Sequence, residues 1–197
     1  MSFSFADKPV LTGELTVLRP FTEQDADGIR EILQDPEVIR FTFEPSSTEL
    51  TLDRLRSWYG SRAIQPDRLD LAVTDRGTGE LLGEVVLHEW DPASRSCTFR
   101  TLIGPRGRGR GIGTEATRLI VGHGFEQLGL HRIALELYSD NHRARRVYEK
   151  AGFVVEGVRR QTQVRDGEWA DETLMSMLAH EWARHRGHPE SVSSTAR

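Results

Sequence analysis

Apolar residues in the first third of the chain recur first at strand spacing and then at helical spacing. Alternation predicts a short strand over Glu14–Pro20. Ala26 and Ile29 then share one face of a helix that ends at Asp35-Pro36. Residues 48–64 predict a second amphipathic helix, whose expected core positions are Leu52, Leu55 and Trp58.

From residue 69 onward the pattern changes to strands and then to an alternation of helices and strands. Three apolar runs separated by turn residues predict an antiparallel meander over 69–73, 81–90 and 96–103. The remainder predicts a helix over 112–128, a strand over 132–137, a helix over 141–151 and two strands joined by Asp166-Gly167. Residues 184–197 are rich in polar and turn-forming types and predict a disordered tail, so 1–183 is expected to form a single domain.

Length and composition limit the classes of function that fit. A chain of 197 residues that is 37% hydrophobic can bury one substantial core. Its net charge of -4 argues against a nucleic-acid or acidic-membrane partner. The single cysteine, Cys97, excludes a disulfide framework and a multi-cysteine metal site. No apolar stretch approaches the roughly 20 residues of a membrane helix, and the start lacks a signal-peptide layout, so the expected location is the cytoplasm.

The segment with the most candidate functional residues is glycine-rich, spans residues 103–116 and joins a strand to a helix. A loop that points successive backbone N–H groups at one anion needs glycine, because a Cβ would obstruct the approach. The free amides and positive dipole end of the following helix add to the attraction. Arg106, Arg108 and Arg110 supply further positive charge. The segment therefore predicts a cradle for a pyrophosphate.

Three other interpretations fit this segment less well. It can be a solvated glycine loop, although glycines are costly to order without a use. Its alternation of Arg and Gly resembles basic segments that contact nucleic-acid backbones, but the acidic chain lacks a surrounding basic or aromatic run. The run from Gly111 to Ala116, with Glu136 downstream, also matches a permissive dinucleotide-binding fingerprint. That fingerprint usually opens a parallel sheet, whereas here it follows hairpins.

A second motif downstream separates these interpretations. Residues 141–153 read Asn-His-Arg-Ala-Arg-Arg-Val-Tyr-Glu-Lys-Ala-Gly-Phe, which combines a capping asparagine, a short helix and a glycine stop. Together with Arg108, Gly111 and Gly113 after a strand, this motif resembles the two signature segments of the GNAT acetyltransferases. Further similarity, at residues 18–20, 35–38 and 171–177, points to the branch that includes ribosomal-protein alanine acetyltransferases and spermidine acetyltransferases.

The resemblance implies a fold, a co-substrate and a set of binding residues. The implied fold is an α/β, largely antiparallel mixed sheet of about seven strands, splayed at its centre and flanked by about four helices. Acetyl-CoA is expected in the opening, with Leu102 and Ile103 pairing their backbone groups with its pantetheine arm and Asn141 contacting the same arm. The residues that match the pyrophosphate loop are Arg108, Gly109, Arg110, Gly111, Ile112, Gly113 and Thr114.

Acetyl transfer to an amine requires a neutral amine, an oxyanion donor and a proton for the departing sulfur. Tyr148 matches the family's acid, and a phenol with a pKa near 10 is still protonated at neutral pH; a core aromatic is the alternative interpretation. Many relatives place a carboxylate where this chain has Thr98. Glu84 is therefore the first candidate for the general base, followed by His88 and Glu89.

The acceptor is the part of the reaction that the sequence constrains least. A protein N-terminal α-amine has a pKa of about 7.7–8.0 and needs less help to lose its proton than a lysine-like amine. We expect such an acceptor, in a monomer or homodimer without a metal ion. The alternatives are a small amine (a polyamine, an amino acid or an antibiotic) and a non-catalytic CoA-binding domain. A polycation would require a carboxylate cluster, for which the candidates are Glu44, Glu49, Asp53, Glu168, Asp171 and Glu172.

Overall fold

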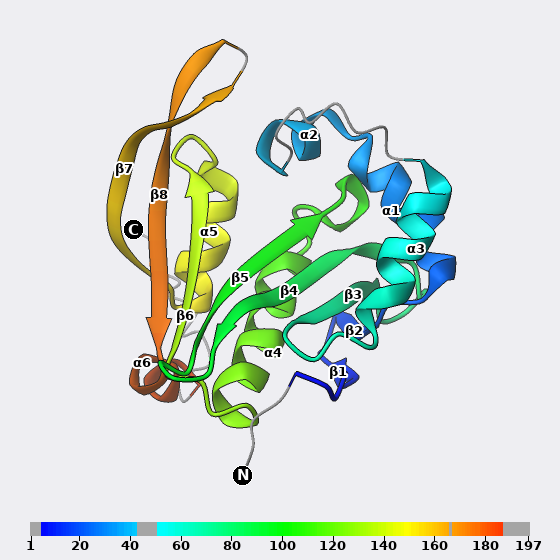
Figure 1. Ribbon diagram of the computed structural model, residues 1–197, viewed down its shortest axis with the longest axis horizontal. Coiled ribbons are helices and arrows are strands. Elements are labelled where there is room, and N and C mark those ends of the chain that lie inside the picture. Colours follow the sequence, from blue (N-terminus) through cyan, green and yellow to red (C-terminus); the bar gives the residue numbers. More distant parts are fainter. Residues whose placement is uncertain (1–4, 43–50, 166, 187–197) are drawn as a thin grey trace, which may run out of the picture.

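An eight-stranded sheet runs through the protein in the order β1-β2-β3-β4-β5-β6-β8-β7 (Figure 1). The computed structural model describes residues 5–42, 51–165 and 167–186. Among the described strands every neighbouring pair is antiparallel except β5 and β6, which run parallel. The strands are β1 (Leu11–Thr12), β2 (Thr16–Pro20), β3 (Leu69–Asp75), β4 (Leu81–Asp91), β5 (Ser96–Ile103), β6 (Arg132–Tyr138), β7 (Val154–Arg165) and β8 (Glu168–Leu178).

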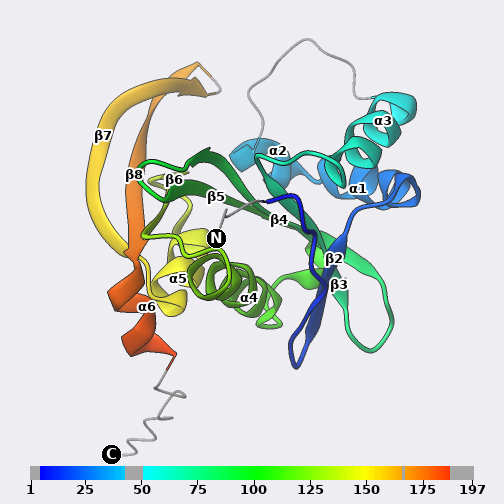
Figure 2. The same cartoon turned by 60° about the horizontal axis from the view of Figure 1, so that its bottom comes forward.

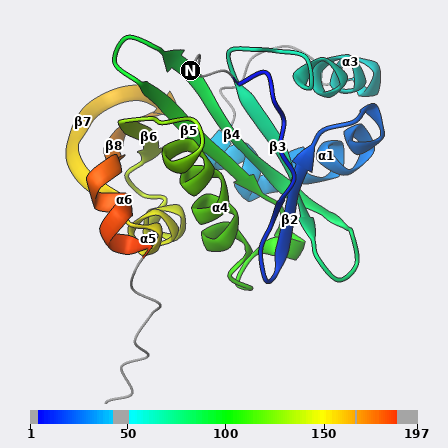
Figure 3. The same ribbon diagram turned by 90° about the horizontal axis from the view of Figure 1, so that it is seen from below.

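Helices cover both faces of this sheet. Figure 2 shows α1, α2 and α3 above one face and α4 and α5 below the other, and Figure 3 gives the same layers from another side. Two short 3-10 turns, η1 (Glu23–Asp25) and η2 (Pro105–Gly107), precede α1 and α4. The helices are α1 (Ala26–Leu33), α2 (Pro36–Thr42), α3 (Leu52–Arg62), α4 (Ile112–Glu126), α5 (His142–Ala151) and α6 (Ala179–His185).

Each face of the sheet has its own hydrophobic core. The larger core lies between the sheet and α4–α5 and includes Phe99, Ile120 and Tyr148. The smaller one joins α1, α3 and β3 through residues such as Ile29, Leu55 and Ala72. Because side chains alternate along a strand, β3 sends Leu71 and Val73 into the larger core and Ala72 into the smaller one. The sheet therefore separates an α4–α5 side from an α1–α3 side, and this division decides where each candidate residue can act.

Capping residues define the ends of the helices that carry the motifs. The Asn141 side chain accepts a hydrogen bond from the Ala144 amide at 3.1 Å and starts α5, as the sequence predicted. The same helix ends at Gly152, whose φ of 108° requires glycine. Gly111, with a φ of 83°, occupies the N-cap position of α4.

The mixed, largely antiparallel fold expected from the sequence is confirmed, with three elements that the pattern did not predict. These are β1, α2 and α6. Asp35-Pro36 ends α1 as predicted, but it also starts α2, because the Asp35 carboxylate accepts the Val38 amide at 3.0 Å and proline suits the first helical turn. Helix α6 extends to His185, two residues into the predicted tail, and residues 187–197 lie outside the described residues.

One predicted core residue is wrong. Trp58 is 50% exposed, whereas the buried residues of α3 are Leu55, Tyr59 and Arg62. The buried face is thus rotated from the predicted one, and the Arg62 guanidinium lies 3.5 Å from the centre of the Trp58 ring. This cation–π contact lets the tryptophan cover an otherwise costly buried charge. Asp166, which was expected in the turn of the last hairpin, lies outside the described residues.

Candidate active site

The sheet opens between β5 and β6, and a pocket occupies the opening. The two strands are paired at Ser96–Arg132, Cys97–Ile133 and Thr98–Ala134, and beyond Thr98 no further register is found between them in the described chain. The pocket measures about 670 Å³ and is lined by β5, the glycine-rich loop, the start of α4, β6, α2 and α5. This volume falls in the range of sites that bury a small molecule or cofactor.

Backbone amides without a partner inside the helix lie at the start of α4, at one end of this pocket. The N–H groups of Ile112, Gly113 and Thr114 precede the first bond within the helix, which Glu115 donates to the Gly111 carbonyl at 3.1 Å. Gly109 and Gly111 adopt φ values of 71° and 83°, which turn the chain toward the pocket. A Cβ on Gly113 would lie 3.6 Å or more from any neighbour, so the protein itself does not require glycine there. A ligand bound close to the backbone, such as a pyrophosphate, would explain why this position is a glycine.

The arginines of the loop are held by carboxylates. Arg108 lines the pocket, but its guanidinium donates to Asp35 at 2.6 Å and to Glu37 at 3.2 Å. Arg110 contacts Asp75 at 2.6 Å and is absent from the lining. The loop therefore offers an anion its backbone amides, while the charges of these two side chains are already matched.

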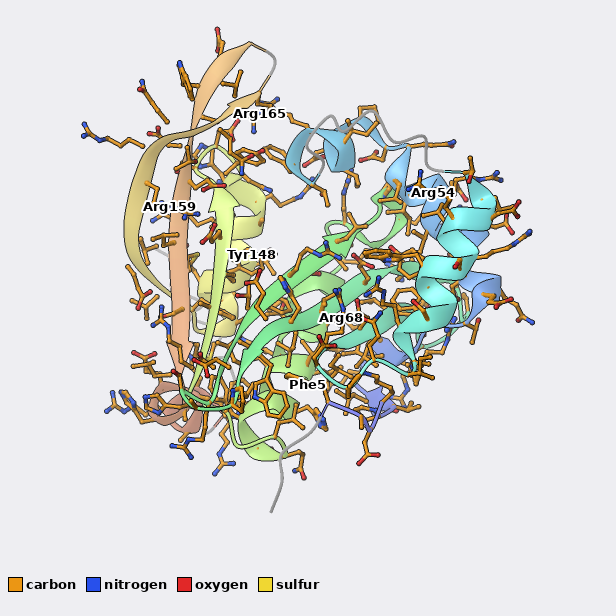
Figure 4. The ribbon with its side chains drawn as sticks, in the orientation of Figure 1. Phe5, Arg54, Arg68, Tyr148, Arg159 and Arg165 are labelled. Carbon is orange, nitrogen blue, oxygen red and sulfur yellow. The ribbon has the colours of Figure 1, made fainter. Side chains whose placement is uncertain are left out.

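Tyr148 reaches the pocket from α5. Tyr148, labelled in Figure 4, is 7% exposed. Its ring centre lies 6.0 Å from that of Phe99 and 6.0 Å from that of Phe153. In the described part of the chain its hydroxyl has no hydrogen-bond partner, although the residue lines the pocket. Burial raises the pKa of this phenol above its usual value of about 10. The group is therefore a protonated donor at neutral pH.

Glu84 occupies a different place from the one that its predicted role requires. It lies 3% exposed on the α1–α3 side and is not in the pocket lining. One carboxylate oxygen accepts the Tyr59 hydroxyl at 3.0 Å and the other accepts Arg100 Nη2 at 2.9 Å. Because both oxygens are engaged and covered, Glu84 is poorly placed to take a proton from a bound amine.

The family model described as "Acetyltransferase (GNAT) domain" matches residues 16–154 of this chain. The chain belongs to the GNAT acetyltransferase family. It is 28% identical over 171 residues to spermidine N(1)-acetyltransferase of Escherichia coli (strain K12), with 86% of this chain and 89% of that protein covered. It is 34% identical over 104 residues to the putative ribosomal N-acetyltransferase YdaF of Bacillus subtilis (strain 168), with 53% and 57% covered.

Two solved structures support the same assignment. The crystal structure of a GCN5-related N-acetyltransferase from Brucella melitensis has a TM-score of 0.76 and 27% identity, with 92% of this chain and 83% of that chain covered. Spermidine N-acetyltransferase from Vibrio cholerae, in complex with CoA and spermine, has a TM-score of 0.77 and 25% identity, with 87% and 99% covered. The protein is thus an acetyl-CoA-dependent N-acetyltransferase.

The pocket brings together most of the residues that the sequence predicted for this GNAT protein. Leu102, Ile103, Arg108, Gly109, Gly111, Gly113, Thr114, Asn141 and Tyr148 all line it. Arg110 and Ile112 do not, since Arg110 turns to Asp75 and the Ile112 side chain is 1% exposed in the core. The secondary base candidates His88 and Glu89 are also absent from the lining, and Glu89 accepts the Thr98 hydroxyl at 2.7 Å.

Among the charged residues of the pocket that sequence reasoning missed are Arg100 and Glu136. Arg100 follows Phe99, and Glu136 lies between Leu135 and Leu137, all three of which are buried in the α4–α5 core. Because strand side chains alternate, Arg100 and Glu136 both project to the opposite, α1–α3 face. A charged residue between apolar residues of a strand is the sequence signal that could have identified both positions. Glu136 was considered only as part of a dinucleotide site.

The carboxylate cluster expected for a polycationic acceptor does not form among its described members. Asp53 is 94% exposed on α3 and contacts Arg56 at 3.6 Å. Asp171 and Glu172 lie on β8, at the opposite side of the molecule in both Figure 1 and Figure 2. Glu172 accepts hydrogen bonds from Arg159 and Gln163, each at 2.8 Å. Glu44 and Glu49 lie outside the described residues.

None of the helices in the described segments combines the length and apolar character needed to cross a membrane. The same segments contain no group of three or more His, Cys, Asp or Glu side chains that could hold a metal ion.

Proposed function

We propose that this GNAT enzyme acetylates the α-amine of a protein N-terminus by direct attack on acetyl-CoA in a ternary complex. The observation that carries the choice of acceptor is the charge on the α1–α3 side of the pocket. Arg100 lies there, and the described carboxylates expected to hold a polycation are separated. A polyamine would meet Arg100 beside Glu136 there rather than a cluster of carboxylates, whereas a single neutral α-amine needs no such cluster.

The two faces of the sheet support a division of roles. Bound acetyl-CoA supplies a thioester carbonyl that is open to attack. Tyr148 faces the pocket from the α4–α5 side, and its buried, protonated hydroxyl can donate to a departing sulfur. Glu136 faces it from the other side and is our proposed proton acceptor in place of Glu84. The other lining carboxylate, Glu37, contacts both Arg108 and Arg143, whereas Glu136 contacts Arg159.

Direct transfer is favoured because no cysteine is found in the pocket lining among the residues that the structure describes. Cys97, the single cysteine of the chain, is 4% exposed and does not line the pocket. Burial raises the pKa of its thiol to about 12, so a thiolate is scarce at neutral pH. An acetyl-cysteine intermediate therefore has no support, and we assign attack to the acceptor amine itself.

The second candidate is acetylation of a small amine, which the spermidine acetyltransferases among the relatives favour. An acetyl-transfer screen that follows CoA thiol release decides between the two. The panel consists of peptides with N-terminal Ala, Ser or Thr, the same peptides with blocked N-termini, spermidine, free amino acids and an aminoglycoside. We expect turnover of the free peptides and none of the blocked ones. Turnover of spermidine without peptide acetylation would contradict the proposal.

A further inference from the structure

Arg100 differs from Arg108 and Arg143, two other arginines of the pocket, in how it is held. Arg108 donates to two carboxylates and is 17% exposed, and Arg143 contacts Glu37. Arg100 is 45% exposed and contacts one carboxylate, Glu84, through Nη2 alone. Within the described residues its Nη1 and Nε groups have no protein partner, and the residue lines the pocket.

The anchor beneath this arginine is buried and fully paired. The Glu84 side chain is 4% exposed, and its second oxygen accepts the hydroxyl of Tyr59, which is itself 4% exposed on α3. Burial, together with the adjacent Glu84 carboxylate, raises the pKa of Tyr59 and keeps it a donor. A buried carboxylate without partners would be costly, so the pair fixes one edge of the guanidinium and leaves the other edge at the pocket.

A guanidinium held in this way is suited to a carboxylate. Its planar fork can give a second, bidentate pair of charge-assisted hydrogen bonds without further ordering of the side chain. Arg100 is two residues from Leu102, a distance of about 7 Å along a strand. An anion bound to Arg100 would therefore lie within one or two residues of an amine placed at the opening of the sheet.

We propose that Arg100 selects acceptors that carry a carboxylate close to the reacting amine, and that Glu84 and Tyr59 are its positioning residues. The inference rests on the proposed acetylation of N-terminal α-amines and names their class, which is acidic at the first or second residue. A free amino acid offers the same chemistry through its α-carboxylate. The same guanidinium offers a polycation no acidic partner.

Matched acceptors isolate this carboxylate. The assay compares peptides beginning Ala-Glu, Ala-Gln and Ala-Lys, and compares free amino acids with their amides. For the wild-type enzyme we expect kcat/KM for Ala-Glu to exceed that for Ala-Gln by about 10- to 100-fold, the usual worth of a hydrogen bond to a charged group. Equal values for these two peptides, or a preference for Ala-Lys, would overturn the proposal.

Variants connect the preference to Arg100. In Arg100→Gln the Ala-Glu to Ala-Gln ratio should fall to about one while the KM for acetyl-CoA stays unchanged, and Arg100→Glu should shift the preference toward Ala-Lys. Arg100→Lys keeps the charge without the fork and should give an intermediate ratio. Glu84→Gln should raise the acceptor KM more than it lowers kcat. The control is Arg186→Gln, since Arg186 lies at the end of α6 and contacts Glu126 at 3.2 Å.

The outcomes separate this inference from the proposed function. If peptides are acetylated without regard to the second residue, the role of Arg100 fails and the N-terminal acceptor stands. If peptides are inert but amino acids react better than their amides, the N-terminal acceptor fails and Arg100 keeps its role. A ratio that survives in a folded Arg100→Gln variant, with folding checked by circular dichroism and acetyl-CoA binding, would assign the preference to another residue.

Discussion

The guanidinium of Arg108 lies 2.6 Å from the Asp35 carboxylate and joins the glycine-rich loop to the start of α2. This hydrogen bond holds the pKa of Asp35 below its usual range, so the pair stays ionised at neutral pH. Arg108 was expected to contact a phosphate, yet its charge is matched within the protein. The backbone amides at the start of α4 are therefore our proposed anchor for the pyrophosphate of acetyl-CoA.

Gly113 provides the sharpest check of that assignment. A Cβ there would make ordinary contacts, 3.6 Å from Ile103 and 3.8 Å from Val147, so Gly113→Ala should fold normally. We expect it to weaken acetyl-CoA binding about 10-fold and Gly113→Glu to abolish it, because the side chain occupies the phosphate position. Calorimetry measures both. Gly157→Ala, on β7 with open space around it, is the control. Normal affinity in folded Gly113→Glu would refute the cradle.

Tyr148→Phe removes the proposed acid and leaves the ring packing against Phe99. Acetyl transfer should slow by about 10²-fold with unchanged acetyl-CoA affinity, the usual effect of losing a positioned general acid. Because burial raises the pKa of Tyr148, the neutral phenol persists at higher pH than a free tyrosine would. The wild-type kcat should therefore not decline through loss of this proton below about pH 10. Equal turnover by wild type and Tyr148→Phe would indicate that Tyr148 has only a packing role.

Glu136→Gln tests the proposed proton acceptor. It should lower kcat by about 10²-fold for an acceptor of ordinary basicity. The deficit should shrink along a series of acceptors with decreasing amine pKa, since such amines are already neutral. Steady-state kinetics across the series measures this trend, with Glu149→Gln as the control because Glu149 contacts Arg145 on α5. A deficit independent of amine pKa would indicate a structural role instead.

Glu115 ties α4 to the turn between β1 and β2, and its removal should cost stability. Its carboxylate accepts the amides of Glu14, Leu15 and Thr16 at 2.7–2.9 Å and the Thr16 hydroxyl at 2.7 Å. We expect Glu115→Ala to lower the free energy of unfolding by about 1–2 kcal/mol at pH 7. Urea unfolding measures the change.

The same contact has a defined pH dependence. Burial raises the pKa of Glu115, but the hydrogen bonds from Thr16, Leu15 and Glu14 outweigh it, and the net shift is downward. A carboxyl whose folded pKa is depressed stabilises the protein above its unfolded pKa of about 4.3 and loses that contribution as the pH falls. The difference between wild type and Glu115→Ala should therefore vanish in acid. A difference that does not shrink as the pH falls below about 4 would contradict this explanation.

Local rules predicted the elements that we propose bind acetyl-CoA, and tertiary contacts decided the rest. The Asn141 cap, the Gly152 stop and the Gly111 turn each follow from a residue's own conformational preference, so the sequence identified them. The partner of Arg108 lies 73 residues away, and nothing local distinguishes a paired arginine from a free one. The register of β4 against β5 likewise places Glu84 beside Leu102, yet the pattern does not reveal that Tyr59 and Arg100 cover its carboxylate.

The three paired positions between β5 and β6 have a mechanical consequence. Past Thr98 the two strands are no longer paired, and they separate on either side of the pocket. On one face of the sheet, the larger core connects the two strands through Phe99, Tyr148 and Phe153. In the described chain, the opposite face of the opening is not closed in this way. A co-substrate that contacts both strands would restrain their motion relative to each other. Binding of the co-substrate should then reduce the flexibility of regions far from any ligand contact, including the β7–β8 hairpin that pairs with β6.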